Sequence, residues 1–61
     1  MIDRAELMRD IRRLVEHQGV RSADRANLRT FLHHMKAGKL LSYQDQLNLW
    51  AYLDRYRAYL R

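Results

Sequence analysis

Residues 22–38 read SADRANLRTFLHHMKAG, and this stretch decides the fold class. Its four large apolar residues are spaced at i, i+3, i+4 and i+7, which places them on one face of an α-helix: Leu28, Phe31, Leu32 and Met35. Ser22 is expected to cap the first turn, where the helix dipole also favours the acid at Asp24. Gly38 follows the last periodic residue and is expected to end the helix. The stretch therefore predicts an amphipathic helix over residues 23–37.

The segment before this stretch carries a second amphipathic pattern, which predicts a helix over residues 4–18. Asp3 can cap its first turn, with Glu6 three residues later as the second half of a capping box. One stripe of side chains is predicted to face the core: Leu7, Ile11, Leu14 and Gln18. Gly19 is expected to end the helix in the left-handed conformation, with Val20 folding back onto the last turn.

The last part of the chain predicts a third helix over residues 43–60, capped by Ser42. At about 100° per residue, most of its large side chains share one broad stripe: Leu49, Tyr52, Leu53, Tyr56, Tyr59 and Leu60. Tyr43, Leu47 and Trp50 point toward a second face. The apolar character of this second face stops midway along the helix.

The chain has 61 residues, no proline and no alternating strand pattern, so helix is the element that the sequence favours. We expect a single domain over residues 1–61. Loops of about four to five residues between the predicted helices suit antiparallel neighbours. The predicted fold class is all-α, a small three-helix bundle; the alternative is a helical hairpin that dimerises.

The metal-binding side chains do not form a site in the sequence. There is no cysteine, which excludes disulfides and thiolate ligands. His33 and His34 are adjacent and point about 100° apart on a helix, so they cannot chelate one ion together. His17 and His34 can meet across a helix pair, but a zinc site needs three or four ligands. We expect no metal and no cofactor.

Catalysis has no clear candidate residues either. Ser22 and Ser42 are explained as helix caps, and Glu6 and Asp10 lie beside arginines as solvated ion-pair partners. A bundle of this size is expected to leave little room for a pocket of a few hundred Å³. We therefore expect a protein that is not an enzyme and has no small-molecule substrate.

The chain also lacks the sequence features of membrane insertion. Residues 1–6 include acids and no apolar core of a signal peptide, and no apolar run approaches the roughly 20 residues of a membrane span. We expect a cytoplasmic protein with no membrane partner.

The formal net charge is +5, and part of it lies on the second predicted helix. On a helical projection Arg25, Arg29 and Lys36 fall near one another, with His33 beside them. Arg21 precedes the same helix and completes the predicted basic stripe. Such a stripe can bind nucleic-acid phosphates without reading sequence, or it can be a solvated face that favours solubility. Base readout by the third helix is not expected, because that helix is apolar.

All four tyrosines and the single tryptophan lie in residues 43–61. Such residues are frequent in binding hot spots, although a small bundle also uses them as core. For Tyr43, Leu47 and Trp50 these two interpretations are evenly balanced. Our leading hypothesis is a small regulatory or adaptor protein that binds another protein through this face and also forms a homodimer. The alternatives are a nucleic-acid-binding protein that uses the basic stripe and a structural subunit of a larger assembly.

Overall fold

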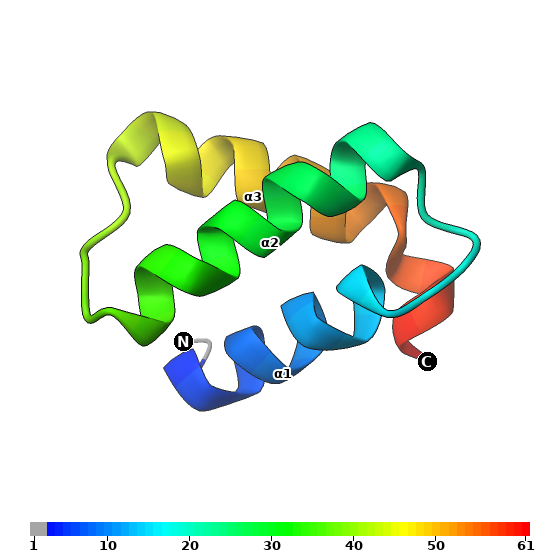
Figure 1. Cartoon of the computed structure of the whole chain (residues 1–61), viewed down its shortest axis with the longest axis horizontal. Helices are drawn as coiled ribbons and strands as arrows, with labels where there is room; N and C mark the ends of the chain where they lie inside the picture. The colour runs from blue at the N-terminus through cyan, green and yellow to red at the C-terminus, as the bar shows by residue number, and fades with distance from the viewer. Residues whose placement is uncertain (1–2) are drawn as a thin grey trace.

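The computed structural model describes residues 3–61; Met1 and Ile2, which the predicted single domain includes, lie outside the described residues. Three α-helices and a short 3₁₀-helix follow one another along the chain: α1 (Arg4–Val15), α2 (Ser22–Lys36), α3 (Tyr43–Arg55) and η1 (Arg57–Leu60) (Figure 1). Over this range there is no strand. The prediction of a small all-α three-helix bundle is confirmed, and the chain does not adopt the alternative helical hairpin.

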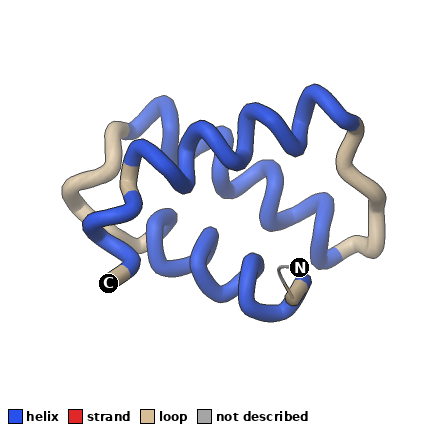
Figure 2. Tube along the Cα trace, turned by 180° about the vertical axis from the view of Figure 1, so that it is seen from behind, coloured by secondary structure: helices blue, strands red, loops and turns tan. Residues whose placement is uncertain are grey.

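Helix α2 is the central element of the bundle. It packs along α1, which runs beneath it in the opposite direction, and it also contacts α3, while η1 returns to α1 (Figures 1 and 2). The guanidinium of Arg4 ties the start of α1 to the end of α2, because it donates to the carbonyls of Met35 at 3.0 Å and Lys39 at 3.3 Å. Helices α1 and α3 make few direct contacts with each other.

The apolar stripes predicted from the sequence supply the core. Nine apolar residues are buried: Ile11, Leu14, Val20, Leu28, Phe31, Leu32, Met35, Leu49 and Tyr56. They include the whole predicted stripe of α2, so that prediction is confirmed. Gln18, predicted to lie on the stripe of α1, is exposed because α1 ends before it.

The end of α1 differs from its prediction. The helix stops at Val15, and Gly19 does not take the left-handed conformation; among the described residues only Gly38 has a positive φ, of 78°. Instead, the Gly19 N–H donates to Nδ1 of His17 at 2.9 Å, which closes a tight turn. Gly19 also leaves room for a neighbouring ring, since a Cβ there would lie 2.9 Å from the hydroxyl oxygen of Tyr59.

Three further helix ends distinguish local rules from tertiary packing. Ser42 caps α3 as predicted, because its hydroxyl accepts from the Asp45 N–H at 3.1 Å. Ser22 does not cap α2: it is the first helical residue, and Arg21 occupies the cap position without a side-chain hydrogen bond. Helix α3 ends at Arg55 rather than at residue 60, because the buried Tyr56 is held by α2 and the chain then turns onto α1.

The burial of the core predicts that a Leu→Ala substitution lowers the free energy of unfolding by different amounts at a buried and at an exposed site. Leu28→Ala should lower the free energy of unfolding by about 2–5 kcal/mol, because Leu28 is fully buried and its removal leaves a cavity. Leu40→Ala, at an 89% exposed position, should change it by less than about 0.5 kcal/mol. Urea titration followed by circular dichroism measures both. If Leu28→Ala does not fold, Ile11→Val is a milder test, with an expected loss of about 0.5–1.5 kcal/mol in the free energy of unfolding. An equal loss for Leu28→Ala and Leu40→Ala would contradict this core.

Candidate functional site

Asp24 determines how α3 is attached to α2. It is the one charged side chain that is buried among residues 3–61. The hydroxyl of Tyr56 donates to its carboxylate, and Arg55 donates to the same oxygen at 3.2 Å. The Tyr56 oxygen in turn accepts from the backbone N–H of Arg21 at 3.4 Å. One carboxylate in the first turn of α2 therefore connects the C-terminal end of α3 to the start of α2.

The pKa of Asp24 is lowered by these contacts. The main cause is the hydroxyl of Tyr56, which donates to the charged carboxylate; the hydrogen bond and positive charge of Arg55 and the charge of Arg21 act in the same direction. Burial acts in the opposite direction but does not outweigh them. The folded protein therefore holds Asp24 in its ionised form.

A second link joins α2 and α3 one turn further along. The amide of Asn27 donates to the hydroxyl of Tyr52 at 2.8 Å, and the ring of Tyr52 lies against Phe31 with a centroid distance of 6.3 Å. Because α3 is attached to α2 along this side, it does not pack along α1. The space between α1 and α3 stays open.

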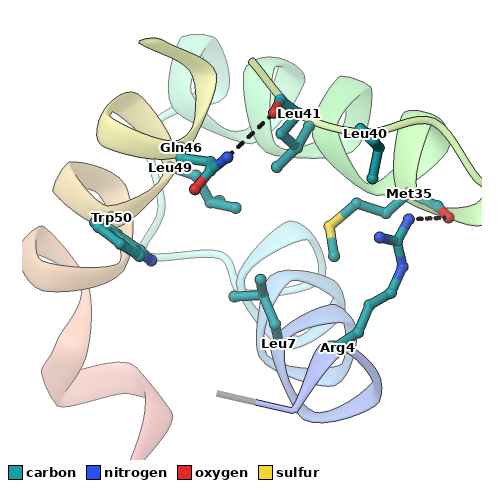
Figure 3. A pocket seen from close by; sticks show the side chains of 8 residues that line it. All are labelled: Arg4, Leu7, Met35, Leu40, Leu41, Gln46, Leu49 and Trp50. Carbon is teal, nitrogen blue, oxygen red and sulfur yellow. Dashed lines mark hydrogen bonds between the residues drawn. The ribbon is translucent and has the colours of Figure 1, made fainter. Parts of the chain in front are cut away.

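This space is an apolar groove of about 570 Å³. Its lining comes from both helices, the end of α2 and the α2–α3 loop (Figure 3): Arg4, Leu7, Met35, Leu40, Leu41, Gln46, Leu49 and Trp50. Leu40 is 89% exposed and Trp50 is 52% exposed, so large apolar side chains form its rim. The expectation that so small a bundle leaves little room for a pocket is therefore wrong, because α3 diverges from α1.

Hydrogen bonds hold the two sides of this groove in place (Figure 3). Arg4 donates to the carbonyls of Met35 and Lys39, which anchors the start of the α2–α3 loop. The amide of Gln46 donates to the carbonyl of Leu41 at 3.1 Å, which anchors the end of that loop to α3. The groove is thus preformed by contacts within the chain.

A second recess, of about 440 Å³, lies on the other side of Trp50. It is lined by residues of α1, α3 and the C-terminal segment: Asp10, Trp50, Leu53, Asp54, Arg57 and Leu60. Trp50 lines both hollows and therefore forms a ridge between them. One hollow has Arg4 in its wall, and the other has Asp10 together with the ion pair of Asp54 and Arg57.

The structure leaves all three residues of the predicted binding face exposed. Tyr43 is 76% exposed and Leu47 is 39% exposed, beside the half-exposed Trp50. Only Trp50 of the three lines the groove; the other two continue the exposed flank of α3 beyond it. Leu40 and Leu41 are groove residues that helical periodicity does not predict, although two leucines directly after Gly38 and Lys39 indicate an apolar loop.

The predicted basic stripe divides into two parts. The guanidinium of Arg25 donates to the carbonyls of His17 at 3.1 Å and Val20 at 2.9 Å, so this side chain holds the α1–α2 loop. Arg21, Arg29 and Lys36 are exposed. The structure therefore places three of the four predicted basic residues where a ligand can reach them and gives the fourth a structural contact.

The histidines have no common ligand geometry. No group of three metal-binding side chains occurs between Asp3 and Arg61. The ring of His17 stacks on Tyr59, with a centroid distance of 4.2 Å and an interplanar angle of 6°.

Within residues 3–61, none of the helices has both the length and the apolar character needed to cross a membrane.

Comparisons with protein-family models, curated proteins and solved structures find no match to this chain.

The lowered pKa of Asp24 predicts a specific acid dependence of stability. The stabilisation is complete above the ordinary carboxyl pKa of about 3.9 and is lost as the pH falls through the lower pKa of the folded state. Asp24→Asn should therefore have a lower melting temperature than the wild type at pH 7. Below pH 4 the difference between the two melting temperatures should become smaller.

Glu16→Gln is the control, because it removes an exposed carboxylate that has no link to another helix. Thermal melts between pH 2 and 7 measure all three proteins. A constant offset between wild type and Asp24→Asn at every pH would show that the ionised carboxylate is not the stabilising group.

Proposed function

We propose that this chain is a small, non-enzymatic adaptor or regulatory protein that acts in the cytoplasm by binding another protein in the groove between α1 and α3. The observation that carries the proposal is the preformed apolar groove with Leu40 and Trp50 exposed on its rim. Exposed apolar patches with polar surroundings are typical of protein-binding surfaces. Tryptophan at the centre of such a surface is a frequent hot spot.

The chemistry of the groove supports binding over catalysis. Arg4 is the one charged side chain in its lining, and its guanidinium already donates to two backbone carbonyls. Its remaining lining residues are apolar apart from Gln46. General acid–base catalysis needs a group that exchanges a proton near neutral pH, and a nucleophile needs an activating base. The groove offers neither.

The occupant that fits this groove best is one amphipathic helix of a partner protein. The groove runs between two helices, where a fourth helix would complete a bundle, and helix recognition uses apolar anchors at i, i+3 or i+4, and i+7. Arg4 lies beside Lys39 at one end, while Asp10 and Asp54 lie beyond Trp50. A partner helix with an acidic residue toward Arg4 and a basic residue toward Asp10 is electrostatically complementary, whereas Asp54 is already paired with Arg57.

A second copy of the chain is a poorer occupant. The amphipathic stripes of its own helices are already buried in its core. Its remaining apolar flank, formed by Tyr43, Leu47 and Trp50, is short, because it ends at the exposed Asp54 one turn after Trp50. Homodimerisation, which the sequence analysis favours, is therefore the competing outcome of the experiment that tests the groove.

The experiment selects helical peptides from a display library on the wild-type protein. Peptides that bind are expected to carry the i, i+3 or i+4, i+7 apolar pattern, and to perturb the amide resonances of Leu7, Leu41 and Leu49. Trp50→Ala should weaken their binding by roughly 30-fold or more, since a hot-spot side chain contributes about 2 kcal/mol.

Two further measurements make the test decisive. Tyr52→Phe is the matched aromatic control, because Tyr52 lies on the α2 side of α3 and should leave peptide affinity unchanged. Sedimentation equilibrium of the free protein should show a monomer. A dimer that Trp50→Ala dissociates assigns the surface to a second copy, and selected peptides that bind Trp50→Ala as tightly as wild type would refute the proposal.

A further inference from the structure

The side of α2 that faces away from the core carries only positive and neutral side chains. We call this side the open face of α2; it consists of six exposed residues: Ser22, Ala26, Arg29, Thr30, His33 and Lys36. The one acid of α2 is Asp24, and it is buried against α3. No acidic residue occurs from Arg25 to Gln44. The acid beside this face is the half-buried Asp45, which lines one recess with Thr30.

The positive charges of the open face are also unpaired. Among the described residues, the ion pairs are Asp24 with Arg55 and Asp54 with Arg57. Both involve α3 or the residues directly after it. Arg29 and Lys36 make no side-chain hydrogen bond or ion pair within residues 3–61. Their hydrogen-bond donors are therefore available to an external anion.

The open face is separate from the groove. Helix α2 packs against both α1 and α3 through its buried stripe, so its opposite side points away from the space between these two helices (Figures 1 and 2). Arg21, exposed at the position that precedes α2, adds a further positive charge at the start of the helix, where its charge also acts on Asp24. The molecule thus presents an apolar surface on one side and a cationic surface on the other.

We infer that the open face of α2, together with Arg21, binds the phosphate backbone of double-stranded nucleic acid without reading its sequence. Arg29 and Lys36 are seven residues apart, or about 10 Å along the helix, which lets them reach different phosphates. Between them lie small or neutral side chains such as Ala26 and Thr30, so the helix can approach a duplex closely. A helix about 10–12 Å across fits the major groove, which is about 12 Å wide.

Base recognition is not part of this inference. The side chains that read adenine are Asn and Gln. Helix α2 has one Asn and no Gln, and Asn27 donates to Tyr52 on the side that faces α3. Arg and Lys can also read guanine, so equal affinity for unrelated sequences is the observation that identifies Arg29 and Lys36 as phosphate contacts, which supply affinity but no sequence information.

A membrane surface is a poorer ligand for the same face. Helices that lie on membranes place large apolar side chains beside their cations. The open face has none, and the exposed apolar residues Tyr43, Leu47 and Trp50 belong to α3. The cations and the apolar residues therefore cannot engage one lipid surface through the same helix.

The test measures fluorescence anisotropy of labelled DNA duplexes of two unrelated sequences at about 50–300 mM salt. We expect equal affinities within about two-fold, and a slope of log K against log salt near −3, because three cations each neutralise about one phosphate. Arg29→Gln combined with Lys36→Gln should reduce that slope by about two. Glutamine keeps the helix propensity, and circular dichroism checks that the variant is folded.

A charge-matched control separates a specific face from the net charge of the protein. Arg57→Gln combined with Arg61→Gln removes the same two charges from η1 and the residue after it, and it should leave the slope unchanged. Trp50→Ala should also leave DNA binding unchanged, so failure of the groove proposal and failure of this inference are distinguishable. Three results would overturn the inference. The first is no DNA binding at about 50 mM salt, and the second is an equal loss of DNA affinity in both charge variants. The third is tighter binding to phosphatidylserine vesicles or to poly-glutamate than to DNA.

Discussion

The architecture depends on the carboxylate of Asp24. Tyr56 and Arg55 both donate to it, and it is the buried charge of the described chain. Removing one partner of a buried charged group is costly, because the other partner is left without compensation. A 61-residue chain without disulfides has a small apolar core, so one such polar link has a large share in deciding where its third helix lies.

The placement of α3 determines the rest of the surface. The link to Asp24 and the contact between Asn27 and Tyr52 attach α3 to α2. Helix α3 therefore cannot also cover α1, and the apolar groove remains between them. The same arrangement turns the only acid of α2 inward and leaves its outer side positive. Both proposed binding surfaces follow from the attachment of α3 to α2.

Sequence periodicity predicts which sides of the helices are buried, whereas the cap rules hold at Ser42 and fail at Ser22. The spacing of Leu28, Phe31, Leu32 and Met35 predicted which side of α2 is buried, and Ser42 was identified as a cap from its residue type and position. The exposure of Tyr43, Leu47 and Trp50 follows from the same helical geometry. Their role in binding stays a prediction.

The remaining features depend on contacts between distant residues, which local rules do not contain. An acid in the first turn, such as Asp24, is ordinarily explained by the helix dipole, and nothing near it in the sequence indicates Tyr56 as its partner. The early end of α3 at Arg55 has the same origin. Gly19 was assigned to a left-handed cap, whereas its small size accommodates Tyr59, forty residues later in the chain. The groove could not be predicted for the same reason.

The most direct test of this account is the solvent accessibility of Trp50 in the free protein. Trp50 is the single tryptophan, so its fluorescence reports on the groove rim without interference from another indole. We predict a monomer by sedimentation, with a red-shifted emission maximum that acrylamide quenches readily. A monomer whose Trp50 emission is blue-shifted and protected from acrylamide would show that α3 covers the groove, and would contradict the account.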